Sequence, residues 1–247
     1  MISLNNKFAL VTGSSRGLGK ATALSLANYG ADIFIHYNKS YDEAKSTVNI
    51  IKQMGRNAYL LQGDLSKYED VKRMFSELNN YVDTLDILVN NAGVGNVNFI
   101  RFITEGEWDN TIDINLKGTF LCSKFYSKLM MKKNTGCIIN ISSGAVFTPG
   151  VKQLCYVTSK AGINAMTRVM AKELGPFGIR VNAVSPGPIN TGMNKMSEED
   201  KKNILGRIAL NRICETDDVT NVIVFLCSSM ADYVTGQIIQ VDGGLFV

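Results

Sequence analysis

Residues 8–29 read FALVTGSSRGLGKATALSLANY, and this stretch decides the fold. It opens with a short apolar run over 8–12, turns at Gly13, Gly17 and Gly19, and continues as a helical pattern over 20–29. A strand that passes through a glycine-rich turn into a helix begins a βαβ unit, whose strands lie parallel in one sheet. The stretch therefore predicts an α/β fold.

The rest of the chain repeats this alternation of short apolar runs and longer helical patterns. Several runs are apolar at every position, as expected of parallel strands that helices cover on both faces. The sequence therefore predicts a doubly wound parallel sheet of about seven strands with helices on both faces, of Rossmann type, in one domain over 1–247. The strands expected after the first cover 33–37, 58–62, 86–90, 137–142, 180–185 and 237–241.

Short sequence signals mark several helix ends. SYDE at 40–43 and SKYE at 66–69 both match a capping box, in which side-chain oxygens accept hydrogen bonds from the first backbone amides of a helix. Gly55 suits the left-handed end of the first of these helices, and Gly175-Pro176 closes a later helix that begins near Cys155. We therefore expect a helix to follow each box.

The charge distribution argues against nucleic acid as a partner. The formal net charge is +4, but 26 Lys and Arg are scattered among 22 Asp and Glu. The densest basic cluster, Lys124, Lys128, Lys132 and Lys133, has roughly helical spacing. We interpret it as the solvated face of a helix in preference to a nucleic-acid or carrier-protein patch.

The cysteines, the histidine and the N-terminus narrow the chemistry further. Five cysteines without a C-x-x-C pair suggest neither a zinc ribbon nor a thioredoxin-like site, and they fit a reducing cytosol. His36 is the only histidine and ends an apolar strand, so neither a Ser-His-Asp relay nor a metal site is expected. Residues 1–6 carry no signal sequence, and no window has eighteen uninterrupted apolar residues. We expect a cytoplasmic protein without a membrane or metal partner.

The turn at 13–19 also predicts a dinucleotide site. Its glycines allow a tight turn and close approach of the backbone to a pyrophosphate, and the amino end of the following helix attracts negative charge. The spacing is G-x-x-x-G-x-G rather than G-x-G-x-x-G. With this spacing the chain resembles the short-chain dehydrogenase/reductase family.

Further motifs carry this resemblance along nearly the whole chain. NNAG at 90–93 resembles the family's loop that supports the sheet and touches the cofactor, and VDGG at 241–244 resembles its closing strand and turn. By the same resemblance Asp64 would contact the adenine, and the segment from Pro186 to Thr191 would hold the nicotinamide carboxamide. The cofactor residues implied are Gly13, Ser15, Arg16, Gly17, Leu18, Gly19, Tyr37, Asn38, Lys39, Asp64, Leu65, Asn91, Ala92, Gly93, Tyr156, Lys160, Pro186, Gly187, Ile189 and Thr191.

The end of the second strand indicates which nicotinamide cofactor is used. An NAD enzyme normally places an acid there, about 20 residues beyond the glycines, to bind the ribose 2′-hydroxyl. That count reaches Tyr37, Asn38 and Lys39, none of which is acidic. Lys39, Asn38 and Arg16 could donate hydrogen bonds or charge to a 2′-phosphate, and even if they only face solvent the missing acid argues against NAD. We therefore expect NADP(H).

Tyr156 and Lys160 are candidate catalytic residues. They lie four residues apart in YVTSK at the start of a predicted helix, so their side chains share one face. A phenol with a pKa of about 10 is a poor acid or base near neutrality, and an adjacent ammonium favours its ionised form. In the family that the chain resembles, this tyrosine exchanges a proton with the substrate oxygen and the lysine binds the nicotinamide ribose. The resemblance also implies that Ser143, with Ser142 as the neighbouring candidate, binds the substrate carbonyl, and that Asn115 helps to hold a water near the lysine.

Within the family, the chain looks most like bacterial 3-oxoacyl-[acyl-carrier-protein] reductases, through AKELGPFGIRVN at 171–182 and the context of the four catalytic residues. That resemblance implies NADPH-dependent reduction of a 3-oxoacyl thioester, linked to acyl carrier protein or to CoA, in fatty acid biosynthesis. The two arginines with which those reductases typically dock the carrier align here with Asn134 and Phe177. Lys128, Lys132 and Lys133 could supply part of the positive charge instead.

Two alternative functions remain. One is a reductase or dehydrogenase of a free small-molecule ketone, sugar or polyol. The other is a non-catalytic NADP(H)-binding sensor or scaffold, which would have little reason to keep all four catalytic residues. The family also implies a homotetramer in which helices near 117–132 and 161–174 pair between subunits.

The region from about 190 to 212 resembles the family's substrate lid. Its apolar residues suit either an apolar substrate wall or a helix packed on its own domain. These residues are Met193, Met196, Ile204, Leu205 and Ile208.

Overall fold

One parallel sheet of seven strands organises the computed structural model, which describes residues 2–95, 97–189 and 198–246. Every predicted strand is present, and each begins and ends within one residue of its predicted bounds, so the predicted fold class is confirmed. Neighbouring strands are parallel throughout. The strands are β1 (Phe8–Val11), β2 (Asp32–Tyr37), β3 (Ala58–Gln62), β4 (Ile87–Asn90), β5 (Gly136–Ile141), β6 (Ile179–Pro186) and β7 (Ile238–Val241).

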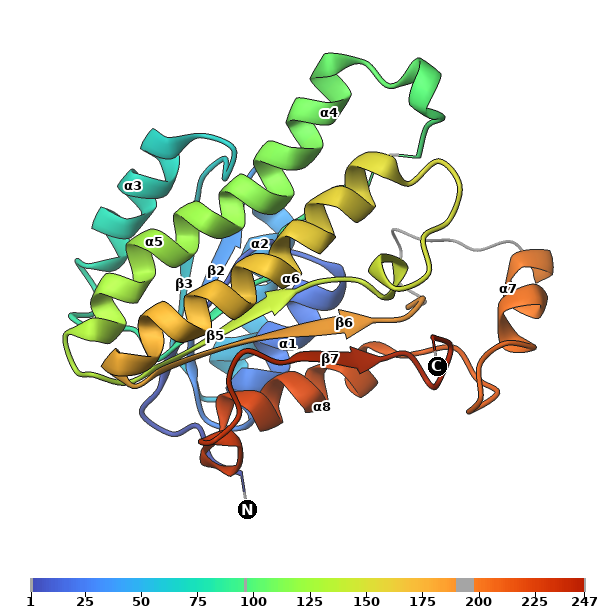
Figure 1. Cartoon of the computed structure of the whole chain (residues 1–247). Coiled ribbons are helices and arrows are strands. Elements are labelled where there is room, and N and C mark those ends of the chain that lie inside the picture. Colours follow the sequence, from blue (N-terminus) through green and yellow to red (C-terminus); the bar gives the residue numbers. More distant parts are fainter. Residues whose placement is uncertain (1, 96, 190–197, 247) are drawn as a thin grey trace.

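The strand order is β3-β2-β1-β4-β5-β6-β7, so the direction of winding reverses between β1 and β4. In open α/β sheets, ligands bind at the carboxyl ends of the strands beside such a reversal. Figure 1 shows β5, β6 and β7 pointing toward the side of the molecule that carries α7 and the C-terminus. A ligand site is therefore expected on that side.

Helices cover both faces of the sheet, and each layer of helices seals its own apolar core. Side chains of α1, α2 and α8 pack into one core, and those of α3, α5 and α6 pack into the other. α4 runs into α5 through a π-helical turn at Asp113–Lys117 (Figure 1). The helices are α1 (Gly17–Asn28), α2 (Tyr41–Gln53), α3 (Tyr68–Leu78), α4 (Glu105–Ile112), α5 (Gly118–Met131), α6 (Leu154–Leu174), α7 (Glu198–Leu205) and α8 (Thr216–Cys227).

Both predicted capping boxes are wrong, although a helix begins near each. Ser40 immediately precedes α2, but its side chain makes no capping hydrogen bond. α3 begins one residue later than the second box requires, so Lys67 and not Ser66 immediately precedes it, and the Ser66 hydroxyl donates to Asp64 at 2.7 Å. Capping boxes form instead before α4 and α8, at Thr104 and Glu215. The patterns thus located each helix start to within one residue but not the side chain that caps it.

The predicted helix stops are confirmed. Gly55 has a φ of 78°, and its amide and that of Arg56 bond the carbonyls of Lys52 and Ile51, which closes α2 with a left-handed turn. α6 ends at Leu174, immediately before Gly175. Within the part of the chain that the structure describes, no helix is long and apolar enough to cross a membrane.

Candidate active site

The glycine-rich turn lies between β1 and α1, at the carboxyl edge of the sheet. Gly13 and Gly17 have φ values of 63° and 57°, which side-chain-bearing residues rarely adopt. A Cβ on Gly19 would collide with the Gly13 carbonyl oxygen and with the side-chain nitrogen Nδ2 of Asn91. The turn can therefore bring its backbone close to a ligand only with glycine at these positions, and the N-terminus of α1 presents partial positive charge there.

His36 holds this turn in place, and the sequence analysis assigned it no role. Its Nδ1 accepts a 2.9 Å hydrogen bond from the Gly13 amide, and its Nε2 lies 3.0 Å from the Gly63 carbonyl oxygen. Nε2 must then carry the proton, so the ring is neutral. Burial lowers the pKa of His36 from 6.5 to about 4, and the bond to Gly63 and the Asp64 charge oppose that only in part. The single histidine thus ties the cofactor turn to the end of β3.

The loop after β4 supports the turn from the other side. The Asn91 side-chain amide donates to the carbonyl oxygens of Thr12 and Gly13, at 2.9 and 3.2 Å. The backbone amides of Asn91 and Ala92 both donate to the Thr12 hydroxyl, at 2.9 and 3.0 Å. The predicted cofactor residues from the two loops are therefore brought together across β1 and β4, where the strand order reverses.

The end of β2 offers polar groups without an acid. Asn38, Lys39 and Arg16 are exposed, whereas Tyr37 is half-buried and its ring meets that of Tyr41 edge-on. The Asn38 carbonyl oxygen is used within the protein, because it accepts a hydrogen bond from Gln62. The side chains of Lys39 and Arg16 therefore lie open to an anionic ligand.

Asp64 and Leu65 follow β3. One Asp64 carboxylate oxygen accepts hydrogen bonds from both the amide and the hydroxyl of Ser66, at 3.0 and 2.7 Å. Leu65 is buried, and its carbonyl oxygen and Cβ close the space above Gly118. Asp64 is thus held rigidly at the carboxyl edge, as a residue that contacts a base would need to be.

Three of the four predicted catalytic residues gather where β5 meets α6. Ser143 follows β5 and lies close enough to the Tyr156 hydroxyl to lower the pKa of that phenol. The Lys160 ammonium lies 5.8 Å from the centre of the Tyr156 ring and donates a 2.7 Å hydrogen bond to the Ile141 carbonyl oxygen. Ser142 is buried, and its hydroxyl contacts the Lys160 carbonyl oxygen at 3.4 Å, so Ser143 is the serine at the site.

Burial tunes both ionisable groups of this cluster. It raises the pKa of Tyr156 above 10.0, and the hydrogen bond with Ser143 offsets part of that rise. It also lowers the pKa of Lys160 from 10.5 to about 8. Lys160 is therefore mostly charged at neutral pH but gives up its proton far more readily than a surface lysine. A tyrosine beside such a group can exchange a proton with a bound oxygen.

Asn115 lies in the π-helical turn between α4 and α5 and is fully buried. Its side-chain amide bonds the amide and the carbonyl of Val94, at 2.7 and 2.9 Å, and donates to the Ser159 hydroxyl at 2.9 Å. Ser159 in turn donates to the Tyr156 carbonyl oxygen at 2.7 Å. Asn115 thus joins the loop after β4 to the second turn of α6. Sequence analysis gave Ser159 no role, although it stands directly before Lys160.

Gly93 separates Asn115 from Lys160. A Cβ at Gly93 would lie 3.2 Å from the Asn115 Oδ1 and 3.5 Å from the Lys160 ammonium. The carboxamide and the ammonium therefore reach the same small space from opposite sides. The four predicted catalytic residues thus form one contiguous site.

The carboxyl end of β6 forms the next wall. The Gly187 amide donates to the Val241 carbonyl oxygen at 2.9 Å, and a Cβ on Gly187 would press on the Asp242 backbone. Ile189 pairs with Cys214 in an isolated parallel bridge. Pro186, Gly187 and Ile189 therefore lie at the edge predicted to hold the nicotinamide, whereas Thr191 lies outside the described residues.

Part of the predicted lid also lies outside the described residues, namely Met193 and Met196. Ile204 and Leu205 are half-buried near the end of α7, and Ile208 is buried. Ile208 meets the chain at Gly243, where a Cβ would contact its side chain. Ile208 therefore packs on its own domain. Among the described residues, no His, Cys, Asp and Glu gather into a metal-binding group.

Comparison with known proteins extends this picture. Residues 13–246 match a family model described as Enoyl-(Acyl carrier protein) reductase. A 3-oxoacyl-[acyl-carrier-protein] reductase of Staphylococcus epidermidis is 42% identical over 245 residues, covering 98% of this chain and 100% of the relative. A (2S)-[(R)-hydroxy(phenyl)methyl]succinyl-CoA dehydrogenase subunit of Thauera aromatica is 37% identical, with 98% of each chain covered. The solved structure of a dehydrogenase/reductase from Sinorhizobium meliloti matches with a TM-score of 0.93 at 31% identity, covering 99% of this chain and 97% of the other.

With this strand order, glycine turn and tyrosine–lysine pair, the chain belongs to the short-chain dehydrogenase/reductase family. Its cofactor is accordingly a nicotinamide dinucleotide. The protein is an oxidoreductase that acts on CH–OH and C=O groups, and it is similar to 3-oxoacyl-[acyl-carrier-protein] reductases.

Proposed function

We propose that this protein is an NADPH-dependent reductase of 3-oxoacyl thioesters, and that Asn115, Ser143, Tyr156 and Lys160 are its active-site residues. The observation that carries the proposal is the cluster of Ser143, Tyr156 and the buried Lys160, whose ammonium lies 5.8 Å from the centre of the Tyr156 ring. The names of the relatives at 40–42% identity support the thioester as the substrate.

A nicotinamide held at Pro186, Gly187 and Ile189 would supply the hydride for the carbonyl carbon. The side chains of the site act on the carbonyl oxygen. Ser143 and Tyr156 donate hydrogen bonds to the carbonyl oxygen and stabilise the negative charge that develops on it. Tyr156 then transfers its proton to that oxygen, which yields the secondary alcohol. Lys160, whose ammonium lies 5.8 Å from the centre of the Tyr156 ring, is the ionisable neighbour from which Tyr156 regains a proton. The same steps in reverse oxidise an alcohol.

The residues of the cofactor turn fit a dinucleotide. Gly19 leaves no room for a side chain, and the amino end of α1 suits a pyrophosphate. Arg16 and Lys39 are exposed at the end of β2, where no acid would repel a 2′-phosphate. NADP(H) is therefore the proposed cofactor. The Arg16→Ala and Lys39→Ala variants should each weaken binding of NADPH and leave binding of NADH almost unchanged, and equal losses for both cofactors would contradict the assignment.

Two thioester substrates are possible, one linked to acyl carrier protein and one linked to CoA. Asn134 and Phe177 occupy the positions of the expected docking arginines, and Lys133 is engaged in a 2.7 Å ion pair with Asp86. Lys128 is exposed on α5 and remains available to an acidic carrier. These departures favour a CoA-linked ketone as the second candidate, in line with the CoA thioester named for the Thauera relative.

The test combines one variant with a substrate panel. Tyr156→Phe should abolish turnover and leave NADPH binding largely intact, and a near-wild-type rate would contradict the mechanism. Loss of NADPH absorbance should be measured with acetoacetyl-CoA, a carrier-linked 3-oxoacyl thioester, and free ketones and sugars. Preference for the carrier-linked substrate would show that the missing arginines are dispensable. Turnover of none of these carbonyls would favour a sensor or scaffold.

A homotetramer is the proposed assembly. Phe120 on α5 and Val169 on α6 are 47% and 55% exposed, on the two helices expected to pair between subunits. Burying such side chains against a second subunit would remove apolar surface from water. Light scattering after size-exclusion chromatography should give four times the mass of the chain. Phe120→Asp should shift the protein toward smaller species.

A further inference from the structure

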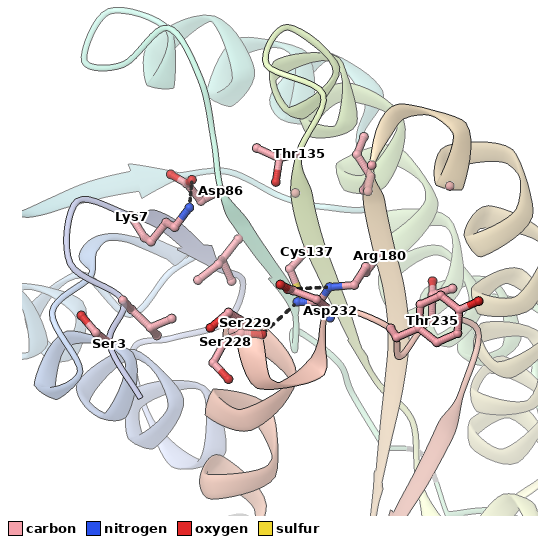
Figure 2. Close-up of a pocket in the computed structure, with 18 residues that line it drawn as sticks. Ser3, Lys7, Asp86, Thr135, Cys137, Arg180, Ser228, Ser229, Asp232 and Thr235 are labelled. Carbon is pink, nitrogen blue, oxygen red and sulfur yellow. Dashed lines mark hydrogen bonds and ion pairs between the residues drawn. The ribbon is translucent and has the colours of Figure 1, made fainter. Parts of the chain in front are cut away.

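A second cavity opens at the amino-terminal edge of the sheet, on the side opposite the active site. It has a volume of about 780 Å³ and lies among the starts of β4, β5 and β6, the N-terminal segment and the end of α8 (Figure 2). Its wall holds two cysteines, Cys137 on β5 and Cys227 at the last position of α8. No step of the proposed reaction uses either thiol.

These two thiols form a pair. Cys137 and Cys227 lie close enough for each to shift the pKa of the other, and neither takes part in a disulfide. The Cys137 sulfur also lies 3.4 Å from the Leu226 carbonyl oxygen, so it points toward the end of α8. Both residues are buried within the same apolar core but line a cavity that a small solute can enter.

A cation stands next to the pair. The Arg180 guanidinium lies close enough for its positive charge to lower the pKa of Cys137. It also reaches Ser228 at 3.4 Å and Asp232 at 3.9 Å (Figure 2), yet its Nη1 is buried without a hydrogen-bond partner. The guanidinium therefore retains donor capacity for a developing thiolate.

The two thiols differ in acidity. The hydrogen bond from Cys227, followed by the Arg180 charge, holds the pKa of Cys137 below 9.0 despite its burial. The same contact raises the pKa of Cys227 well above that value. Cys137, which lies beside the Arg180 guanidinium, is therefore the thiol placed to react as a thiolate, with Cys227 as its neighbour in the cavity wall. Low thiol pKa beside a cation, together with a nearby second thiol, is the arrangement of oxidation-sensitive cysteines.

We propose that Cys137 and Cys227 are a redox-active dithiol, which a small hydroperoxide entering this cavity oxidises to an intramolecular disulfide. The Cys137 thiolate attacks one peroxide oxygen, the O–O bond breaks, and the leaving group departs as water or an alcohol after it takes up a proton. Cys137 is then a sulfenic acid. The Cys227 sulfur displaces the hydroxyl group, which leaves as water with the Cys227 proton. Each cysteine sulfur has then lost one electron, and the peroxide has gained two.

The new bond would join β5 to α8 far from the catalytic edge. Cross-linking positions that are distant in the chain restricts the unfolded state most strongly. Oxidation should therefore raise the melting temperature by about 5 °C or more and leave turnover unchanged. A thiol reductant should reverse both the bond and the shift.

The experiment treats the full-length protein with hydrogen peroxide and counts free thiols by alkylation and mass spectrometry. The wild type should lose two of its five thiols, and peptide mapping should show Cys137 linked to Cys227. Cys227→Ser should stop at a sulfenic acid on Cys137 that dimedone traps. Cys137→Ser should keep its remaining thiols over the same period.

Two further variants separate the pair from general oxidation. Cys122→Ser removes a buried cysteine from the other face of the sheet and should leave disulfide formation unchanged. Arg180→Gln should slow the loss of thiols about tenfold or more, because the thiolate loses its cation. A pair that stays reduced while other cysteines react, or a disulfide between different cysteines, would overturn the proposal. Equal oxidation rates with and without Arg180 would overturn the role of the guanidinium.

Discussion

Lowering the pH from 7 to 4 should destabilise the folded protein because His36 becomes protonated. His36 is the only histidine of the chain, so no other imidazole contributes. The neutral ring accepts from the Gly13 amide and donates to the Gly63 carbonyl. Protonation would place a second N–H against the Gly13 amide, where an acceptor is needed. The Asp64 carboxylate nearby favours the charged ring, but burial outweighs it.

The magnitude follows from the pKa of His36 in the two states. The unfolded chain binds the proton near pH 6.5, whereas the folded chain binds it only near pH 4. At about 1.4 kcal/mol per pH unit, this difference corresponds to about 3 kcal/mol of folding free energy. Since the folded pKa is depressed, the contribution is fully present above pH 6.5. It declines as the pH falls and is lost below about 4.

The assay is urea unfolding of the wild type and of His36→Asn at several values between pH 4 and pH 8. Asparagine can still accept from the Gly13 amide but does not titrate, so the carboxylates contribute alike to both proteins. The difference in unfolding free energy between them should shrink by about 3 kcal/mol between pH 7 and pH 4. NADPH affinity of the wild type should also fall more steeply than that of the variant. A constant or widening difference would refute the reasoning.

Four further substitutions test the active site. Gly19→Ala should lower NADPH affinity about a hundredfold or more, because its Cβ would push the Asn91 side chain out of the turn. Isothermal calorimetry measures the affinity, and the loss of folding free energy should be smaller than the loss of binding free energy. Asn115→Ala should destabilise the fold by about 2–4 kcal/mol in urea unfolding, since two backbone groups lose buried partners, whereas Ser159→Ala should cost about half as much. Lys160→Met should reduce turnover at least about a hundredfold. It should also raise the free energy of unfolding at pH 7 by about 1–3 kcal/mol, because burial of the ammonium disfavours the charged lysine. A variant less stable than the wild type would contradict that account.

Much of the fold was predictable because buried parallel strands are short apolar runs whose ends turn residues mark. The glycine turn and the spacing of Tyr156 and Lys160 are equally local, so the main features of the site could be predicted as well. The predicted capping boxes were wrong because a helix start depends on contacts outside the local sequence. α3 begins at Tyr68, one residue later than the SKYE pattern requires, and a four-residue pattern does not contain the contacts that set this start.

The sequence by itself thus determined the succession of strands and helices along the chain, the three glycines of the turn and the identities of the proposed catalytic side chains. Only the tertiary structure decided that His36 braces the Gly13 turn, that Asn115 clamps Val94 to Ser159, and that Cys137 meets Cys227. Secondary structure follows from neighbours a few residues apart, whose periodicity is visible in the sequence. The other contacts join residues 21 to 90 positions apart, and they exist only because packing both faces of one sheet brings distant loops to the same edge.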